Sequence, residues 1–328
     1  MTLIIDPALF RDDAIPEHIC AFNAELLATI SAGGDMWAIP AAQVRANRLE
    51  GKGPFPLEAE STRARTLLAP RANGDGDIVL RLIEPIGRPM RGLYLHIHGG
   101  GWMLGAADAQ DERLQEIAEA TGLGCVSVDY RLAPEYPYPA GPDDCYDAAR
   151  FLLEAEHGLP NEIMTIGGES AGAHLSVLTL LRLRDAGHGG RFCAANLTAG
   201  VYDLGQTASS LNWGADRLVL ATRDMANFAS AFLAADEDRR SPVVSPLFAS
   251  LNDMPPALFS VGTKDLLLDD TLLMATRWHV ANGNTELDVT PGGVHVFQSF
   301  RHLDIAQASN ARIDGFLNAA ANRKEPSS

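Results

Sequence analysis

Residues 163–183 read IMTIGGESAGAHLSVLTLLRL, which joins a short apolar run, a glycine-flanked serine and a longer apolar stretch. The run at 163–167 predicts a buried strand, and the pattern of 173–183 predicts a helix. Between them lies the motif G-x-S-x-G, centred on Ser170. A serine in so tight a turn sits in strained backbone at the carboxyl edge of a sheet, and the flanking glycines remove Cβ atoms that would clash with neighbouring elements. The motif therefore predicts a nucleophilic serine.

A second glycine-rich segment, HGGGW at 98–102, directly follows a predicted strand at 92–97. Consecutive glycines can turn several backbone N–H groups toward one point, where they stabilise the negative charge that develops on a carbonyl oxygen under attack. We expect an oxyanion hole here, formed by the N–H groups of Gly99, Gly100 and Ala171.

The same segment admits a different interpretation as half of a metal site. His96 and His98 alternate along the strand and project to one face. No further His or Asp follows close by to complete a set of ligands, so we expect neither a metal nor another cofactor.

A nucleophilic serine needs a histidine as its base. His295 lies in PGGVHVF at 291–297, which we interpret as a glycine-rich loop at the carboxyl edge of the sheet, after the last strand. Several other histidines fall in predicted helices or in segments far from the carboxyl end of a strand. His295 is the predicted base.

The base in turn needs an orienting acid. Asp265 follows a predicted strand at 257–261 and so lies at the same edge. Asp269 and Asp270 fit the first turn of the next helix, where negative charge is favourable. With Asp265 as the acid, the chain order is serine, acid, histidine, which is the order of the α/β-hydrolases and differs from two unrelated serine-protease orders.

Hydrophobic patterning predicts an α/β fold. Two alternating runs within 63–84 flank Asn73-Gly74-Asp75-Gly76 and predict a β-hairpin. Helical patterns then alternate with short apolar runs, which indicates a mostly parallel sheet covered on both faces. These runs lie at 92–97, 124–128, 163–167, 194–198, 257–261 and 287–289.

Two segments depart from this alternation. Residues 1–55 read as helical, and 202–251 contain helical pieces without a convincing strand. A structureless loop of that length is unusual in a compact domain, so we predict that 202–251 form a helical insertion folded over one edge of the sheet. The remaining segments, 56–201 and 252–328, would form the two parts of the core.

The combination of motifs resembles the hormone-sensitive-lipase-like family of α/β-hydrolase esterases. Besides HGGGW and GESAG, the chain carries DYRLAPE at 129–135, followed by Pro-Ala at 139–140, and the segments DLLLDD and VHVF. The resemblance implies a mostly parallel eight-stranded sheet flanked by helices, with 1–55 and 202–251 forming a helical cap. Two mild departures are Glu169, where the largest subgroup carries Asp, and Ala173, where a third glycine is frequent.

The resemblance implies a serine hydrolase that cleaves carboxylic esters through an acyl-enzyme on Ser170. We expect small to medium esters, because no large exposed apolar surface for an oil interface is evident. The large side chains of Trp37, Trp102 and Trp213 are candidates to line an apolar substrate pocket, although packing within the protein is an equally good explanation for them.

Two other functions use the same residues differently. The triad would also serve an amidase or an arylformamidase, because a protonated His295 can expel an amine. A ligand-binding receptor on a hydrolase scaffold, as in the gibberellin receptors that have lost the triad histidine, is the third interpretation, and the presence of His295 argues against it.

Composition limits the partners. The formal charge of −16 and the lack of a basic patch argue against binding to nucleic acid or to an anionic membrane. There is no secretory signal pattern, no apolar run of the roughly 18 residues that a membrane span needs, and no C-x-x-C pair. We therefore predict a cytoplasmic monomer or homodimer, with the edge strand near 287–289 as a plausible dimer contact and a small-molecule ester as the partner.

Overall fold

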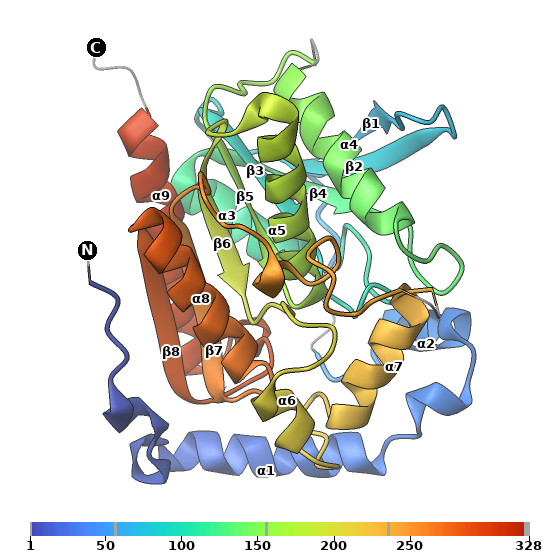
Figure 1. The fold of residues 1–328 in the computed structure, drawn as a ribbon, viewed down its shortest axis with the longest axis vertical. Coiled ribbons are helices and arrows are strands. Elements are labelled where there is room, and N and C mark those ends of the chain that lie inside the picture. Colours follow the sequence, from blue (N-terminus) through green and yellow to red (C-terminus); the bar gives the residue numbers. More distant parts are fainter. Residues whose placement is uncertain (1, 56–57, 155–156, 235–236, 325–328) are drawn as a thin grey trace.

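The computed structural model describes residues 2–55, 58–154, 157–234 and 237–324. Its centre is one eight-stranded sheet with the strand order β1-β2-β4-β3-β5-β6-β7-β8 (Figure 1). The strands are β1 (Arg65–Pro70), β2 (Asp77–Ile83), β3 (Gly92–Ile97), β4 (Leu123–Asp129), β5 (Met164–Glu169), β6 (Phe192–Thr198), β7 (Ala257–Lys264) and β8 (Thr285–Val294). Strand β2 is antiparallel to β1 and β4, and the other neighbours are parallel. The predicted mostly parallel sheet, with its hairpin at 73–76, is confirmed.

Helices cover both faces of this sheet (Figure 1). One apolar cluster joins α3 and α9 to one face, and a larger cluster joins α4, α5 and α8 to the other. Because both faces are covered, the central strands are buried on both sides, which explains their nearly continuous apolar sequences. These helices are α3 (Asp111–Thr121), α4 (Ala140–Glu154), α5 (Ala171–Leu183), α8 (Leu268–Asn282) and α9 (Asp304–Lys324).

Four further helices gather at one end of the molecule, in the lower part of Figure 1. They come from the two segments that were predicted to be helical: α1 (Glu17–Ala32) and α2 (Ala41–Leu49), then α6 (Ala208–Asn212) and α7 (Thr222–Phe232). The segments meet where the Trp37 ring packs edge-on against Phe228 at 4.9 Å and Trp37 Nε1 donates to Asp224 Oδ1 at 2.7 Å. The four-part division of the chain stays a prediction.

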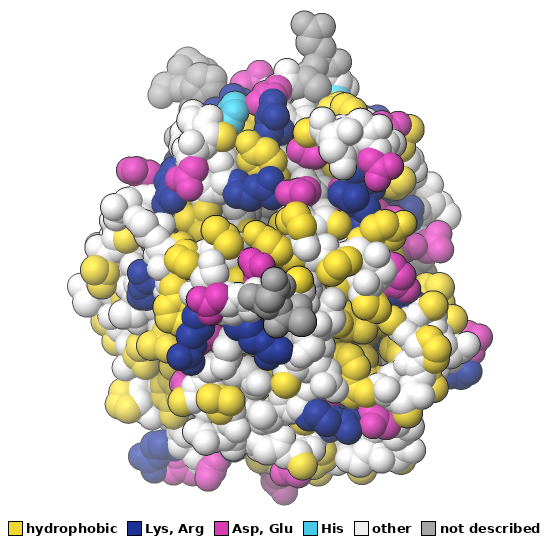
Figure 2. Space-filling view, turned by 45° about the vertical axis from the view of Figure 1, so that its right-hand side comes forward, with side chains coloured by type: hydrophobic (Ala, Val, Ile, Leu, Met, Phe, Trp, Pro, Cys, Tyr) yellow, Lys and Arg dark blue, Asp and Glu magenta, His cyan; other side chains and the backbone are white. Residues whose placement is uncertain are grey.

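The surface mixes charges of both signs. On the face drawn in Figure 2, basic and acidic side chains are interspersed, with hydrophobic side chains between them. None of the described helices is both long and apolar enough to span a lipid bilayer.

The turn between β5 and α5 presses against the end of β3. A Cβ atom added to Gly172 would lie 1.8 Å from the carbonyl oxygen of Ile97, and one added to Gly168 would lie 2.0 Å from the same oxygen. Because this obstacle is backbone within a strand, it cannot move aside as a flexible side chain would. Glycine is required at both positions for steric reasons.

His174, in α5, links the same region to neighbouring segments through two hydrogen bonds. Its Nδ1 accepts a hydrogen bond from Trp102 Nε1 at 3.0 Å, and its Nε2 donates to the carbonyl oxygen of Val244 at 2.8 Å. These partners require the neutral imidazole, and burial lowers the pKa of His174 from 6.5 to about 4.

The substitution Gly172→Ala should lower the free energy of unfolding by about 2 kcal/mol or more, because the methyl group forces the turn away from β3. Gly315→Ala is the matched control. Gly315 lies in α9, and an added Cβ there meets no atom of the described structure within 4 Å. That variant should be stabilised by about 0.5–1 kcal/mol. Urea denaturation of both variants measures the difference, and equal effects would contradict the steric argument.

The contribution of His174 to the free energy of unfolding should fall as the pH decreases from 6.5 toward 4, because the unfolded chain protonates His174 in this range and the folded protein does not. The two pKa values imply a loss of up to about 3 kcal/mol from this residue. His174→Gln offers one acceptor and one donor but does not titrate, so the free energy of unfolding of the wild type should decrease relative to that of the variant as the pH falls. Urea denaturation of both proteins at pH 7, 5.5 and 4.5 tests this, and parallel losses would show that His174 does not contribute.

Candidate active site

Ser170, His295 and Asp265 form one hydrogen-bonded line. His295 Nε2 lies 2.9 Å from Ser170 Oγ, and His295 Nδ1 lies 3.0 and 3.2 Å from the two carboxylate oxygens of Asp265. Ser170 is 8% exposed, His295 3% and Asp265 1%. Each residue directly follows a parallel strand, β5, β8 and β7 respectively, so the topology brings three distant positions to one edge of the sheet.

Strained backbone presents the serine. Ser170 has φ +56° and ψ −121°, a conformation that non-glycine residues rarely adopt. Its N–H donates to the carbonyl oxygen of Thr198 at 2.9 Å, and its own carbonyl oxygen accepts from the His174 N–H at 3.2 Å. Since both backbone groups are bonded on the protein side, the turn holds the hydroxyl toward His295.

His295 reaches the site from a longer strand than the sequence predicts. The apolar run predicts a strand over 287–289, and the glycine-rich segment predicts a loop over 291–297. In the structure β8 continues to Val294. Here the glycines permit close strand packing: a Cβ atom on Gly262 of β7 would lie 1.9 Å from the carbonyl oxygen of Gly293. The predicted loop at 291–294 is therefore wrong. Gly293 packs against Gly262 of β7, and Gly292, with φ +75°, lies where the pairing of β7 and β8 is irregular.

The Asp265 carboxylate is oriented by the backbone as well as by histidine. Its Oδ1 accepts from the Leu267 N–H at 2.9 Å, which leaves Oδ2 as the closer partner of His295. This bond fixes which oxygen faces the imidazole.

Asp269 and Asp270, expected only at the first turn of a helix, accept bonds from the chain after β6. Asp269 Oδ2 accepts from the Ser209 N–H at 2.8 Å, and Asp270 Oδ1 accepts from the N–H groups of Tyr202 and Asp203 at 2.6 and 3.0 Å. Burial raises the pKa of Asp270 to about 7. The two carboxylates anchor the start of the insertion at 202–251.

Three successive peptide units of the glycine loop are held by hydrogen bonds. In the first unit, the carbonyl oxygen of His98 accepts from Tyr130 Oη at 2.9 Å and the Gly99 N–H donates to Glu169 Oε1 at 2.5 Å. In the second, the carbonyl oxygen of Gly99 accepts from His98 Nδ1 at 2.8 Å. In the third, the carbonyl oxygen of Gly100 accepts from the Leu104 N–H at 2.9 Å.

This arrangement corrects one predicted donor. The N–H of Gly99 is already bonded to Glu169, so it is not free for a substrate oxygen. Within the described residues, no hydrogen bond occupies the N–H groups of Gly100, Gly101 or Ala171. A run of glycines does not show in the sequence which of its N–H groups a neighbouring carboxylate binds.

His96 and His98 serve different partners. His96 Nδ1 lies 3.0 Å from Ser127 Oγ and its Nε2 lies 3.1 Å from Glu169 Oε2, whereas the His98 ring stacks on Tyr130 at 4.3 Å. Burial lowers the pKa of His98, in keeping with a neutral imidazole that donates from Nδ1.

The three tryptophans lie in different environments. Trp102 is 2% exposed, stacks on Phe232 at 4.6 Å and is bonded to His174, and its place in a substrate pocket stays a prediction. Trp213 is half-buried, with its Nε1 bonded to the carbonyl oxygen of Asp216 at 2.7 Å.

Trp37 packs against Phe228, and Phe228 in turn contacts the glycine loop. A Cβ atom added to Gly101 would lie 2.3 Å from Phe228 Cδ1, so the Phe228 ring rests directly on that loop. Of the three tryptophans, Trp37 is the one that these contacts link to the loop.

Comparison with known proteins agrees with this geometry. Residues 94–299 match a family described as alpha/beta hydrolase fold. An acetyl esterase of Salmonella choleraesuis is 30% identical over 273 residues, which cover 82% of this chain and 83% of that protein.

Solved structures give the same result. An esterase of Pyrobaculum calidifontis superposes with a TM-score of 0.77 at 27% identity, covering 86% of this chain and 94% of that one. A hormone-sensitive lipase from a metagenome library gives a TM-score of 0.79 at 25% identity, covering 92% and 98% respectively. The chain therefore belongs to the α/β-hydrolase family, and within it to the hormone-sensitive-lipase-like carboxylesterases.

Proposed function

We propose that this protein hydrolyses small to medium carboxylic esters through an acyl-enzyme on Ser170. The observation that carries the proposal is the hydrogen-bonded line from Ser170 through His295 to Asp265. A hydroxyl so placed loses its proton to the imidazole as it attacks a carbonyl carbon. Relatives named acetyl esterase support a short acyl group.

In the first half of the reaction, Ser170 Oγ attacks the ester carbonyl carbon while its proton moves to His295 Nε2. Asp265 holds the Nδ1–H and stabilises the imidazolium that forms. The tetrahedral intermediate then collapses: its bond to the alcohol oxygen breaks, and that oxygen takes the proton from His295 Nε2. The products are a free alcohol and an acyl-serine.

The second half repeats these steps with water as the nucleophile. A water molecule gives its proton to His295 Nε2 and attacks the acyl carbon, after which Ser170 Oγ leaves and recovers the proton. The carboxylic acid is released, and the triad returns to its starting state without a cofactor.

The oxyanion of both intermediates would be bound by the N–H groups of Gly100, Gly101 and Ala171, in place of the set that began with Gly99. Removing a single donor of this kind typically costs about 10²–10³ in rate. The support is that these three groups are unoccupied among the described hydrogen bonds and that Ala171 directly follows the nucleophile.

Phe228, backed by Trp37, would limit the size of the substrate, because its ring rests on Gly101 beside the proposed oxyanion donors. Bulky groups would have to displace two packed aromatic rings. The proposal keeps the cytoplasmic location and the monomer or homodimer predicted from the sequence.

Ser170→Ala should reduce turnover of p-nitrophenyl acetate and butyrate to background, because it removes the hydroxyl on which the acyl-enzyme forms. The wild type should be labelled irreversibly by a fluorophosphonate, with the adduct on Ser170, and the variant should stay unlabelled. Circular dichroism and thermal unfolding control for folding. Turnover that persists in the folded variant would refute the assignment.

Asp265→Asn should lower kcat by about 10⁴-fold, because it changes the tautomer of His295. The Leu267 N–H retains the side-chain oxygen of the new amide, so its NH₂ group replaces Oδ2 and faces His295 Nδ1. The ring must then carry its proton on Nε2, where it cannot accept one from Ser170.

Asp269→Asn is the control for that variant, since Asp269 bonds to Ser209 and not to the triad. Steady-state kinetics on p-nitrophenyl acetate should show a change of no more than a few-fold. Equal losses in the two variants would contradict the tautomer argument.

A further inference from the structure

We propose that Glu169 is a positioning residue for the oxyanion donors, tying the nucleophile turn to the glycine loop at 98–101. The inference rests on the proposed esterase function and adds a residue to it. Glu169 is the last residue of β5, the immediate neighbour of Ser170, and only 8% exposed.

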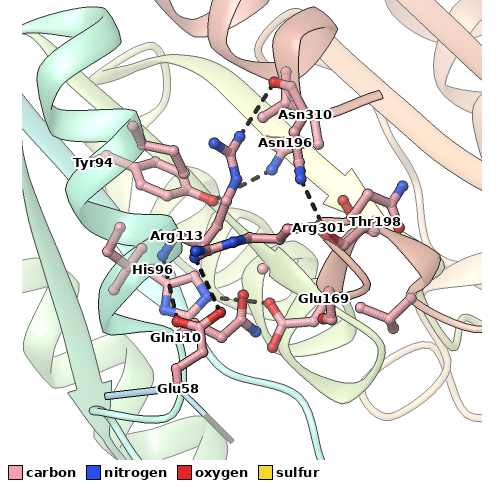
Figure 3. A pocket seen from close by; sticks show the side chains of 17 residues that line it. Glu58, Tyr94, His96, Gln110, Arg113, Glu169, Asn196, Thr198, Arg301 and Asn310 are labelled. Atoms are coloured by element: carbon pink, nitrogen blue, oxygen red, sulfur yellow. Dashed lines mark hydrogen bonds and ion pairs between the residues drawn. The ribbon is translucent and has the colours of Figure 1, made fainter. Parts of the chain in front are cut away.

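Both carboxylate oxygens of Glu169 have defined partners. Oε1 accepts from the Gly99 N–H at 2.5 Å, and Oε2 lies 3.1 Å from His96 Nε2. The other ring nitrogen of His96 lies 3.0 Å from Ser127 Oγ, so the imidazole is held between β4 and β5. Figure 3 shows His96 and Glu169 facing each other across the ends of their strands. The carboxylate has little freedom to turn away from the loop.

The bond to Gly99 acts on the peptide unit that precedes the free donors. A peptide unit is planar, so holding its N–H on one side and its carbonyl oxygen on the other fixes its orientation. Glu169 and Tyr130 hold the unit between His98 and Gly99 in this way. The N–H groups of Gly100 and Gly101 follow in the next two units, so a rotation of the first would re-aim both.

The surroundings of Glu169 argue against a direct role in substrate binding. Its side chain borders a cavity of about 40 Å³ that is also lined by His96, Arg113, Asn196 and Arg301 (Figure 3). A cavity of that size holds a few water molecules and no ester. Glu169 would therefore influence the reaction through the glycine loop.

A positioning role predicts an effect on the transition state that a purely structural role does not. The oxyanion exists only after attack on the carbonyl, so misplaced donors lower kcat and leave KM nearly unchanged. General destabilisation lowers the amount of folded enzyme and leaves the kcat of each correctly folded site unchanged.

The test compares Glu169→Ala with Glu169→Gln, with rates expressed per site that reacts with a fluorophosphonate. Gln keeps an oxygen to accept from Gly99, and its NH₂ group can donate to His96 Nε2 once the histidine proton moves to Nδ1, facing the Ser127 hydroxyl. Asp111→Asn is the matched control, because Asp111 is a fully buried carboxylate that accepts from the Ser61 N–H and pairs with Arg81.

Glu169→Ala should lower kcat about 10- to 100-fold with KM within about threefold, and Glu169→Gln should keep kcat within about threefold of the wild type. A trifluoromethyl ketone, whose adduct with Ser170 carries an oxyanion, should bind the Ala variant more weakly by about the same factor as kcat falls. Asp111→Asn should lower Tm without changing kcat per labelled site.

An unchanged kcat per labelled site in Glu169→Ala would overturn the proposal, as would a Gln variant as impaired as the Ala variant. A fall in kcat without weaker binding of the ketone would do the same. These outcomes differ from failure of the esterase function itself, which would show as no labelling and no ester turnover in the wild type.

Discussion

The carbonyl oxygen of Ile97 occupies space that two side chains would otherwise need. Gly168 and Gly172 have no Cβ atom, so the turn after β5 packs directly against this oxygen at the end of β3. That contact brings Ser170 and the glycine loop together, because Ile97 is the last residue before His98. The hydrogen bonds of the site orient groups that this contact has brought close together.

Hydrogen bonds to the backbone do much of this orienting. The glycine loop is held one peptide unit at a time by Tyr130, Glu169, His98 and Leu104. The hydrogen bond from the Leu267 N–H orients the Asp265 carboxylate that bonds to His295. Such pre-organisation matters because donors fixed before the reaction need not reorganise while charge develops.

Much of the fold could be predicted from the sequence because its signals are local. The strand at 92–97 has the predicted bounds, and the hairpin at 73–76 follows from turn chemistry. The triad residues were named from where each lies relative to a strand, and the structure brings them within hydrogen-bonding distance.

The errors arise where a side chain's role depends on distant partners. Pro291-Gly292-Gly293 has the composition of a turn, yet it belongs to β8: Gly293 packs against Gly262 of β7, and Gly292 lies against Ile15 and Ile19. The sequence predicts Gly99 as an oxyanion donor because it does not show that the Glu169 carboxylate binds the Gly99 N–H. The stacking of Trp102 on Phe232 likewise has no signal in the sequence around either residue.

The contact between Phe228 and Gly101 has a consequence for selectivity. The Phe228 ring, which we propose limits the size of the substrate, also rests on the backbone that would bind the oxyanion, so the two cannot adjust independently. A substrate too large for the site would displace the ring and remove support from the loop in the same movement. Discrimination between esters by size would then appear in the rate of the chemical step that follows binding. Two esters could bind equally well yet react at very different rates.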